Sequence, residues 1–384
     1  ACGRYGPCPS LRLARNPQIT ATSVTEGVAR ASVRVWFPPH CAWQCASLSL
    51  VTTISGRSGS GPVPGAVERT VAVNGVQLRV FEAGPANGPV VLLAHGFPEL
   101  AYSWRHQIPA LAAAGFRVLA PDQRGYGGSS RPDDVDAYDI TALSGDLIGL
   151  LDDVGADRAA VVGHDWGAVV AWSSPLLHPD RIAAVAGLSV PPVPRPLTPP
   201  TEAFRRIFGD NFFYILYFQQ PGIADAEMAA DPGRAMRRML GGMQAPADDA
   251  AAARMLAPGT AGFIDRLPEP GQLPDWLSPE ELGHYVAEFS RTGFTGALNW
   301  YRNFDRNWRI MAQPVTATIS VPALFIGGTD DPVLNFTKID RAREVAVGPY
   351  RQVMLTGAGH WITQERPAEV NAELLGFLTE SRWW

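Results

Sequence analysis

The sequence predicts an α/β fold, in which helices cover both faces of a mostly parallel sheet and a helical cap is inserted into it. Short apolar runs, of the kind found in fully buried strands, alternate with helical segments along much of the chain. The pentapeptide Gly163-His164-Asp165-Trp166-Gly167 stands where one of these strands must turn sharply into a helix. A Pro-rich stretch at residues 191–196 interrupts the alternation, which resumes near residue 322. At 384 residues the chain is long enough for one such domain with an insertion.

Residues 67–190 are expected to form the first part of the core. Alternating apolar residues on either side of the turn Asn74-Gly75 predict a hairpin at its start. Such alternation of strands and helices is typical of a parallel sheet covered on both sides. The expected strands cover residues 67–73, 76–82, 89–94, 116–120, 158–162 and 182–190, and the expected helices cover 104–114, 139–154 and 168–177.

Residues 191–318 are expected to form the helical cap. The proline run at its start stiffens the backbone and forbids helix continuation, and the segment after it is helical, aromatic and interrupted by further prolines. The cap is therefore placed where it can cover the strand ends that carry the pentapeptide. The second part of the core is expected over residues 319–384, with strands at 322–327 and 350–355 and a closing helix at 367–379.

Residues 1–66 are expected to be an irregular, disordered N-terminal extension, because they lack sustained periodicity and end in a Gly- and Ser-rich stretch. The cysteines of the chain all lie in this extension: Cys2, Cys8, Cys41 and Cys45. The rest of the chain therefore relies on neither a disulfide nor a thiolate metal site, and the sequence predicts no metal and no cofactor. This cysteine usage fits a cytosolic compartment.

The balance of charge indicates a small-molecule partner. The formal net charge is -5, and no block of Lys and Arg suggests binding to nucleic acid or to an anionic membrane surface. No stretch approaches the roughly 18 consecutive apolar residues that could span a bilayer. The oligomeric state stays open, with a homodimer as one alternative.

The pentapeptide at 163–167 has the pattern of a nucleophile elbow. Small residues two positions before and two positions after the central one let the turn close tightly and hold the middle side chain out over the end of the sheet. That side chain is the carboxylate of Asp165, where a serine is usual. A carboxylate attacks carbon without first losing a proton, which gives an alkyl-enzyme ester. The predicted chemistry is therefore substitution rather than acyl transfer.

Two later residues complete a candidate triad with Asp165. His360 follows the strand expected at 350–355, and Asp331 follows the strand before it. The chain order of nucleophile, acid and histidine is that of the α/β-hydrolase fold. A neutral His360 would take a proton from the water that attacks the ester, while Asp331 fixes the imidazole tautomer. Spacing alone does not decide between Asp331 and its neighbour Asp330 as the acid.

An oxyanion hole is expected from two backbone N–H groups. Phe97 lies in a glycine-bearing turn after a buried strand, where its N–H can lie beside that of Trp166. His164, inside the pentapeptide, is expected to pack or hydrogen-bond behind the site. The other histidines outside the turn and the triad are interpreted as structural residues: His40, His106, His178 and His284.

Together these segments resemble the epoxide hydrolases of the α/β-hydrolase fold, and the resemblance runs from about residue 67 to the end of the chain. Two cap segments, 214–222 and 298–303, are also similar to those that carry the epoxide-activating tyrosines of this family. The resemblance implies that Tyr214 and Tyr301 are these tyrosines. The core motifs that carry it are His95-Gly96-Phe97-Pro98-Glu99, Asp122-Gln123-Arg124-Gly125-Tyr126-Gly127, Gly163-His164-Asp165-Trp166-Gly167 and Gly359-His360-Trp361.

By this resemblance the partners are a small hydrophobic epoxide and water, and the product is a vicinal diol. Two phenols can share the charge that develops on the epoxide oxygen, because a phenol with a pKa of about 10 stays protonated at neutral pH. Tyr217, one helical turn from Tyr214, is a rival donor. The residues expected to contact the substrate are Phe97, Trp166, Tyr217 and Trp300.

Two other functions stay open. A haloalkane dehalogenase would use the same carboxylate and the same histidine, with Trp166 helping to hold the departing halide, although Phe97 offers no side-chain donor. A catalytically silent member of the fold could bind a small hydrophobic molecule in the same pocket. The intact set of Asp165, Asp331 and His360 argues against that second alternative.

Overall fold

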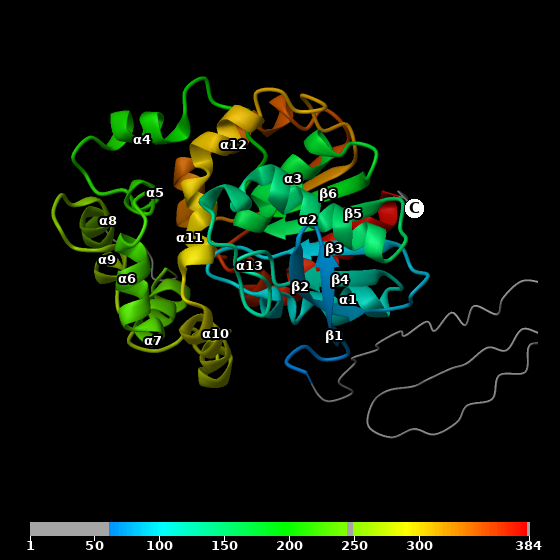
Figure 1. Ribbon diagram of the computed structural model, residues 1–384, viewed down its shortest axis with the longest axis horizontal. Coiled ribbons are helices and arrows are strands. Elements are labelled where there is room, and N and C mark those ends of the chain that lie inside the picture. The colour runs from blue at the N-terminus through cyan, green and yellow to red at the C-terminus, as the bar shows by residue number, and fades with distance from the viewer. Residues whose placement is uncertain (1–60, 244–248, 382–384) are drawn as a thin grey trace, which may run out of the picture. The chain divides into compact units, whose positions relative to one another are not determined.

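The computed structural model describes residues 61–243 and 249–381. Its centre is an eight-stranded sheet with the order β1-β2-β4-β3-β5-β6-β7-β8 (Figure 1). β2 pairs antiparallel with β1 and β4, and all other neighbours are parallel. The predicted sheet is thus confirmed, and each strand lies within two residues of its expected bounds. The strands are β1 (Val67–Val73), β2 (Val76–Ala83), β3 (Val90–Ala94), β4 (Arg117–Pro121), β5 (Ala159–His164), β6 (Ile182–Leu188), β7 (Ala323–Gly328) and β8 (Tyr350–Leu355).

The hairpin of β1 and β2 forms because Asn74-Gly75 supplies the backbone that a two-residue turn needs. Both residues have positive φ angles, 46° and 78°. This combination gives the tight turn whose twist matches that of two antiparallel strands. Val73 therefore pairs directly with Val76.

Two apolar layers, one on each face of the sheet, form the core. Successive residues of β3 alternate between them, with Leu92 in one layer and Leu93 in the other, as the two-residue period of a strand requires. The predicted helices on both faces are confirmed. One layer is covered by α2 (Ile140–Asp153) and α3 (Trp166–Leu177), and the other by α1 (Gln107–Ala113) and α14 (Pro367–Glu380). Shorter helices connect these elements: η1 (Ala101–Trp104), η2 (Val135–Tyr138), η4 (Pro332–Phe336), η5 (Ile339–Glu344) and α13 (Ile362–Glu365).

Between β6 and β7 the chain leaves the sheet and forms the helical insertion that the sequence predicts. The insertion contains one π-helical turn, η3, directly after α7. Within the described ranges, no helix combines the length and the apolar character needed to cross a membrane. The inserted helices are α4 (Pro200–Phe208), α5 (Tyr214–Tyr217), α6 (Ile223–Ala230), α7 (Pro232–Met236), η3 (Arg237–Gly242), α8 (Asp249–Leu256), α9 (Phe263–Arg266), α10 (Pro279–Thr292), α11 (Thr295–Arg302) and α12 (Phe304–Ile310).

The domain bounds expected at residues 67, 191 and 319 stay predictions. β1 begins at Val67, which is where the expected core begins. Most of the expected N-terminal extension, residues 1–60, lies outside the described residues, and so do the cysteines and His40.

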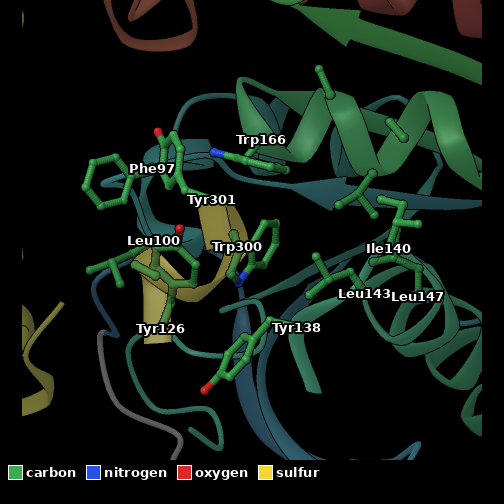
Figure 2. Close-up of a cluster of buried hydrophobic side chains, with 14 of the residues drawn as sticks. Phe97, Leu100, Tyr126, Tyr138, Ile140, Leu143, Leu147, Trp166, Trp300 and Tyr301 are labelled. Atoms are coloured by element: carbon green, nitrogen blue, oxygen red, sulfur yellow. The ribbon is translucent and has the colours of Figure 1, made fainter. Parts of the chain in front are cut away.

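Polar contacts fasten the insertion to the core. Trp300 of α11 donates its indole N–H to the backbone carbonyl of Arg124, at 3.0 Å, and the hydroxyl groups of Tyr285 and Ser103 lie 2.7 Å apart. Figure 2 shows Trp300 and its neighbour Tyr301 among the aromatic side chains of the core. The first contact holds α11 against the core, and the second holds α10, to which Tyr285 belongs.

Candidate active site

Asp165 occupies a strained turn between β5 and α3. Its backbone has φ 51° and ψ -118°. Residues other than glycine rarely adopt this conformation, which is typical of a nucleophile elbow. The flanking glycines are required, because a Cβ on Gly163 would collide with the carbonyl oxygen of Gly167, and one on Gly167 with that of Ala94. The turn therefore presents the carboxylate as the sequence predicts.

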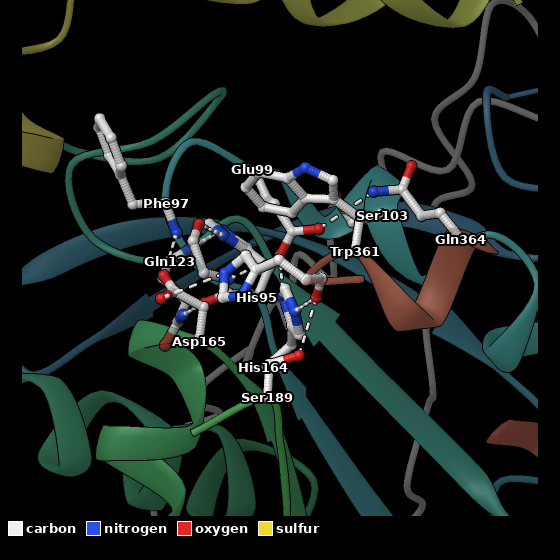
Figure 3. Close-up of polar contacts among 12 residues, drawn as sticks. His95, Phe97, Glu99, Ser103, Gln123, His164, Asp165, Ser189, Trp361 and Gln364 are labelled. Carbon is white, nitrogen blue, oxygen red and sulfur yellow. Dashed lines mark hydrogen bonds and ion pairs between the residues drawn. The ribbon is translucent and has the colours of Figure 1, made fainter. Parts of the chain in front are cut away.

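The Asp165 carboxylate accepts a hydrogen bond from one of the two backbone N–H groups that are expected to form the oxyanion hole. The N–H of Phe97 lies 2.9 Å from its Oδ1 (Figure 3). Trp166 is the first residue of α3, where a backbone N–H has no partner within the helix. Gly96 makes this approach possible, because any Cβ there would lie only 2.5 Å from the Cβ of Asp165.

His360 lies between two carboxylates. Its Nε2 is 3.6 Å from Oδ2 of Asp165, and its Nδ1 is 2.9 Å from Oδ2 of Asp331. Asp331 is buried, whereas Asp330 is exposed and accepts a hydrogen bond from the hydroxyl of Thr329. The geometry therefore selects Asp331, not Asp330, as the partner of the imidazole.

Charge raises the pKa of His360. Burial by itself would lower the pKa of this imidazole, but the negative charges of Asp331 and Asp165 outweigh burial and raise it well above the usual value. The free site therefore favours the imidazolium, and any change that neutralises Asp165 favours the neutral ring.

A third carboxylate, that of Glu99, and the imidazole of His164 lie behind the site, both fully buried. Nδ1 of His164 is 2.6 Å from Oε2 of Glu99, and its Nε2 is 2.8 Å from the backbone carbonyl of His360 (Figure 3). Both partners are acceptors, so both ring nitrogens of His164 carry protons. The prediction that His164 supports the site from behind therefore agrees with its position.

The charges of this buried pair stabilise each other. Burial would raise the pKa of Glu99, but the charge and the hydrogen bond of His164 lower it to about 2. Burial would lower the pKa of His164, but Glu99 raises it. Glu99 also accepts from the side-chain amide of Gln364, at 3.1 Å. In the sequence analysis no role was assigned to Glu99 or to Gln364. Glu99 could have been noticed as a glutamate in an apolar turn, whereas nothing in the sequence indicates a role for Gln364.

A cavity of about 250 Å³ opens onto Asp165 and His360. Tyr214 and Tyr301 also line it, with ring centroids 6.1 Å apart. The remaining lining is almost entirely apolar: Phe97, Pro98, Phe212, Phe213, Phe218, Met239, Gly242, Met243, Met255, Leu256, Phe263, Leu267, Pro268, Pro332, Val333, Phe336 and Trp361, together with Asp330 and Asn335. The cavity thus joins the carboxylate, the imidazole and both tyrosines.

The two tyrosines are strong candidates for hydrogen-bond donors, since their phenols resist ionisation. Burial is the larger cause that raises the pKa of Tyr214 and of Tyr301, and the negative charge of Asp165 is the second. The ring of Tyr301 packs edge-on against Phe97 and Trp166, at 5.3 and 5.1 Å between centroids (Figure 2). Both phenols therefore stay protonated beside the Asp165 carboxylate.

Three of the four residues expected to contact the substrate lie outside the lining of this cavity. Tyr217 does not line the cavity, because its hydroxyl donates to Glu227 at 3.0 Å. Trp300 is buried behind the cavity, where its indole is bound to the core. The Trp166 ring packs against Tyr301 and is absent from the cavity lining. Of the four expected residues, Phe97 alone is part of the lining.

The other histidines lie away from the cavity. His106, His178 and His284 are absent from its lining, and burial lowers the pKa of each. Among the residues described by the structure, no group of three His, Cys, Asp or Glu side chains could hold a metal ion.

The chain is similar to one family model, to curated protein sequences and to solved structures. Residues 89–367 match the family model described as the alpha/beta hydrolase fold. The chain is 70% identical over 312 residues to Epoxide hydrolase A of Mycobacterium tuberculosis (strain ATCC 25618 / H37Rv), which covers 81% of this chain and 97% of that protein. It is 41% identical over 322 residues to Epoxide hydrolase 3 of Siraitia grosvenorii, covering 81% and 98%. The crystal structure of Epoxide Hydrolase A from Mycobacterium thermoresistibile aligns with a TM-score of 0.80 and 68% identity, covering 82% and 98%.

Proposed function

Because this chain belongs to the epoxide hydrolases of the α/β-hydrolase fold, we propose that it converts epoxides into vicinal diols through a covalent ester of Asp165. The observation that carries this mechanism is the meeting of four groups at one cavity: the Asp165 carboxylate, the His360 imidazole and the phenols of Tyr214 and Tyr301. Water and the epoxide are the reactants, and no cofactor takes part.

The first step is alkylation of Asp165. One carboxylate oxygen attacks an epoxide carbon, and the bond from this carbon to the epoxide oxygen breaks. The electron pair goes to that oxygen, which accepts hydrogen bonds from the phenols of Tyr214 and Tyr301. It takes the proton of one of these phenols and leaves a tyrosinate. Preorganised donors stabilise such a developing charge in a site that excludes water.

The second step is hydrolysis of the ester. His360 takes a proton from a water molecule, and the water oxygen attacks the carbonyl carbon of the ester. The oxyanion that forms accepts hydrogen bonds from the N–H groups of Phe97 and Trp166, and Asp331 stabilises the imidazolium. Collapse of the intermediate breaks the bond between the former carbonyl carbon and the diol oxygen, and this oxygen takes the proton of the new carboxyl group. The diol leaves, Asp165 is again a carboxylate, and the imidazolium returns its proton to the tyrosinate.

Each segment of the chain has its own role in the proposed function. We propose that residues 67–190 and 319–384 form the catalytic core, that residues 191–318 form a cap that supplies both tyrosines, and that residues 1–66 are an extension outside this unit. The cytosolic location and the homodimer stay predictions.

Two observations favour this function over its alternatives. The side chains that line the cavity offer two phenols, whereas Trp166, the expected halide contact, lies behind Tyr301. The complete set of Asp165, His360 and Asp331 disfavours a silent binding protein.

A single-turnover reaction in ¹⁸O-labelled water, with the enzyme in excess over the epoxide, tests the mechanism. Attack on the ester carbonyl puts the label into Asp165 and leaves the first diol unlabelled. Label in the first diol would show direct attack of water on the epoxide. In a parallel reaction with a haloalkane, halide release by an enzyme that forms no diol from the epoxide would show a dehalogenase.

A further inference from the structure

We propose that the enzyme selects neutral, apolar epoxides and that Asp330, at the cavity, excludes epoxides that carry a carboxylate. The inference rests on the proposed function and names the class of substrate. It follows from the charged side chains that line the cavity, from the absence of cationic side chains among the described lining residues, and from the hydrogen bonds that cap arginines make elsewhere.

The charges on the cavity wall favour a neutral ligand. The ionisable side chains of the lining, apart from the two tyrosines, are Asp165, His360 and Asp330. Asp165 and His360 are committed to the reaction. Among the described lining residues there is neither a lysine nor an arginine, so a carboxylate in the cavity would find no cation there. A buried carboxylate without a partner carries a large desolvation penalty.

Three arginines of the cap have side chains whose N–H groups are bound by acceptors outside the cavity lining. Arg266 is buried, stacks on the ring of Phe212 at 4.0 Å and is absent from the lining. Its N–H groups donate to the backbone carbonyls of Arg254, Ala257 and Ala261. Arg237 and Arg238 both bind Glu269, at 2.8 and 2.7 Å. These guanidinium groups already have their acceptors.

The wall on the cap side suits a hydrocarbon. Met239, Met243 and Met255 line it together with Leu256 and Leu267. Methionine is unbranched and polarisable, so it adapts to irregular apolar shapes. This part of the cavity can therefore accept an alkyl or aryl group of variable outline but offers little to a charged one.

Asp330 adds repulsion to this lack of attraction. It lies directly after the end of β7, and its carboxylate is exposed and without a cationic partner in the contacts that the structure shows. It lines the cavity beside Pro332, Val333 and Phe336. Two like charges a few ångströms apart near a protein surface repel strongly enough to change binding by roughly tenfold or more. Asp330 thus acts on the charge of the ligand, separately from the role of Asp331.

The test compares two substrates with one carbon skeleton, 10,11-epoxyundecanoic acid and its methyl ester, with 1,2-epoxyundecane as an uncharged reference. At neutral pH we expect kcat/KM for the acid to be at least about tenfold below that for the ester. Asp330→Asn should raise the ratio of acid to ester at least about threefold. Asp180→Asn is the matched control. Asp180 is exposed before the N-terminal end of β6, whereas Asp330 follows the C-terminal end of the neighbouring parallel strand β7, so this change should leave the ratio unchanged.

Salt provides a second measurement that needs no variant. Added salt screens exposed charges, so the ratio of acid to ester in the unaltered enzyme should rise with ionic strength. An acid hydrolysed as well as its ester would overturn the inference, and so would a ratio that neither Asp330→Asn nor salt changes. Absence of diol from all three epoxides would instead contradict the proposed function.

Discussion

The Nε2 atom of His360 lies 3.6 Å from Oδ2 of Asp165, which leaves the imidazole beside the carboxylate without a short hydrogen bond between them. A base at this position can reach a water molecule next to the carbonyl carbon of an Asp165 ester. It is poorly placed to assist the first attack, which needs no base. The two halves of the reaction should therefore be separable by mutation.

Replacing His360 by Gln should block the second half-reaction alone. Loss of a general base lowers a rate by roughly 10²- to 10⁴-fold, so the Asp165 ester should accumulate. Intact-protein mass spectrometry after mixing with an epoxide would detect the added mass. Asp165→Ala is the control and should show neither turnover nor adduct. Lost turnover in the His360 variant without any adduct would count against the covalent route.

Tyr214→Phe and Tyr301→Phe should each slow alkylation, because each change deletes one donor and keeps the ring that packs the cap. Removal of one preorganised donor typically lowers a rate by roughly 10²- to 10³-fold, and the double variant should be almost inactive. Stopped-flow measurement of the alkylation rate is the appropriate assay. Tyr217→Phe is the matched control, because the Tyr217 hydroxyl binds Glu227 outside the cavity. A slow Tyr217 variant with normal Tyr214 and Tyr301 variants would reassign the donors.

The two half-reactions should respond differently to acid. The negative charges of Asp331 and Asp165 raise the pKa of His360 in the free enzyme. Formation of the ester removes the charge of Asp165, so the pKa of His360 falls and the neutral base becomes available. As the pH decreases, the imidazole is protonated again and hydrolysis slows, whereas alkylation continues while Asp165 is ionised. Quenched samples taken between about pH 5 and about pH 9 should contain more ester at low pH. A constant ester fraction would argue against His360 as the base.

Gly96→Ala should disable the site by crowding. Its Cβ would lie 2.5 Å from Cβ and 2.7 Å from Oδ1 of Asp165, so the carboxylate must move away from the Phe97 N–H. Overpacking of this kind costs about 1–3 kcal/mol of stability, and kcat should fall as well. The control is Gly283→Ala, on the exposed side of α10, where a Cβ meets nothing within 4 Å. Normal kcat for the Gly96 variant would show that the contact is not restrictive.

Glu99→Gln should destabilise the fold, because it leaves the imidazolium of His164 buried without a countercharge. Breaking a buried ion pair costs about 3–5 kcal/mol, measurable by urea unfolding. Glu68→Gln, at an exposed position of β1, is the control. Equal stability of the two variants would mean that Glu99 and His164 do not form a charged pair.

The same pair sets a pH window for stability. The pKa of Glu99 is lowered, so its contribution is complete above the unfolded value of 4.5 and is lost as the pH falls toward about 2. The pKa of His164 is raised, so its contribution is complete below the unfolded value of 6.5 and is lost as the pH rises through the folded value. The stability difference between wild type and Glu99→Gln should therefore be largest between these two unfolded values.

The sequence predicted the sheet well because its inner strands are short apolar runs and its first hairpin shows apolar residues alternating around the turn Asn74-Gly75. The elbow, the late histidine and the cap segment carrying Tyr301 were also visible, since each is marked by local residues. Side-chain direction was not predictable in the cap. Tyr214 and Tyr217 share α5, and only the position of Glu227 shows that Tyr217 faces away from the cavity. Asp330 and Asp331 are likewise equivalent in sequence and differ in burial.

The hydrogen-bonded pairing of β6 with β7 has a consequence for how such enzymes diversify. Leu188 pairs with Ile326, although an entire helical layer separates them along the chain. The insertion therefore leaves and rejoins the sheet at adjacent strands, so its length can change without altering the order of the strands. Loop closure becomes less favourable by only about 0.6 kcal/mol for each doubling of length. Changes in the insertion that spare Tyr214 and Tyr301 can therefore alter the cavity, while the core keeps Asp165, Asp331 and His360. Substrate range should accordingly change more readily than reaction type.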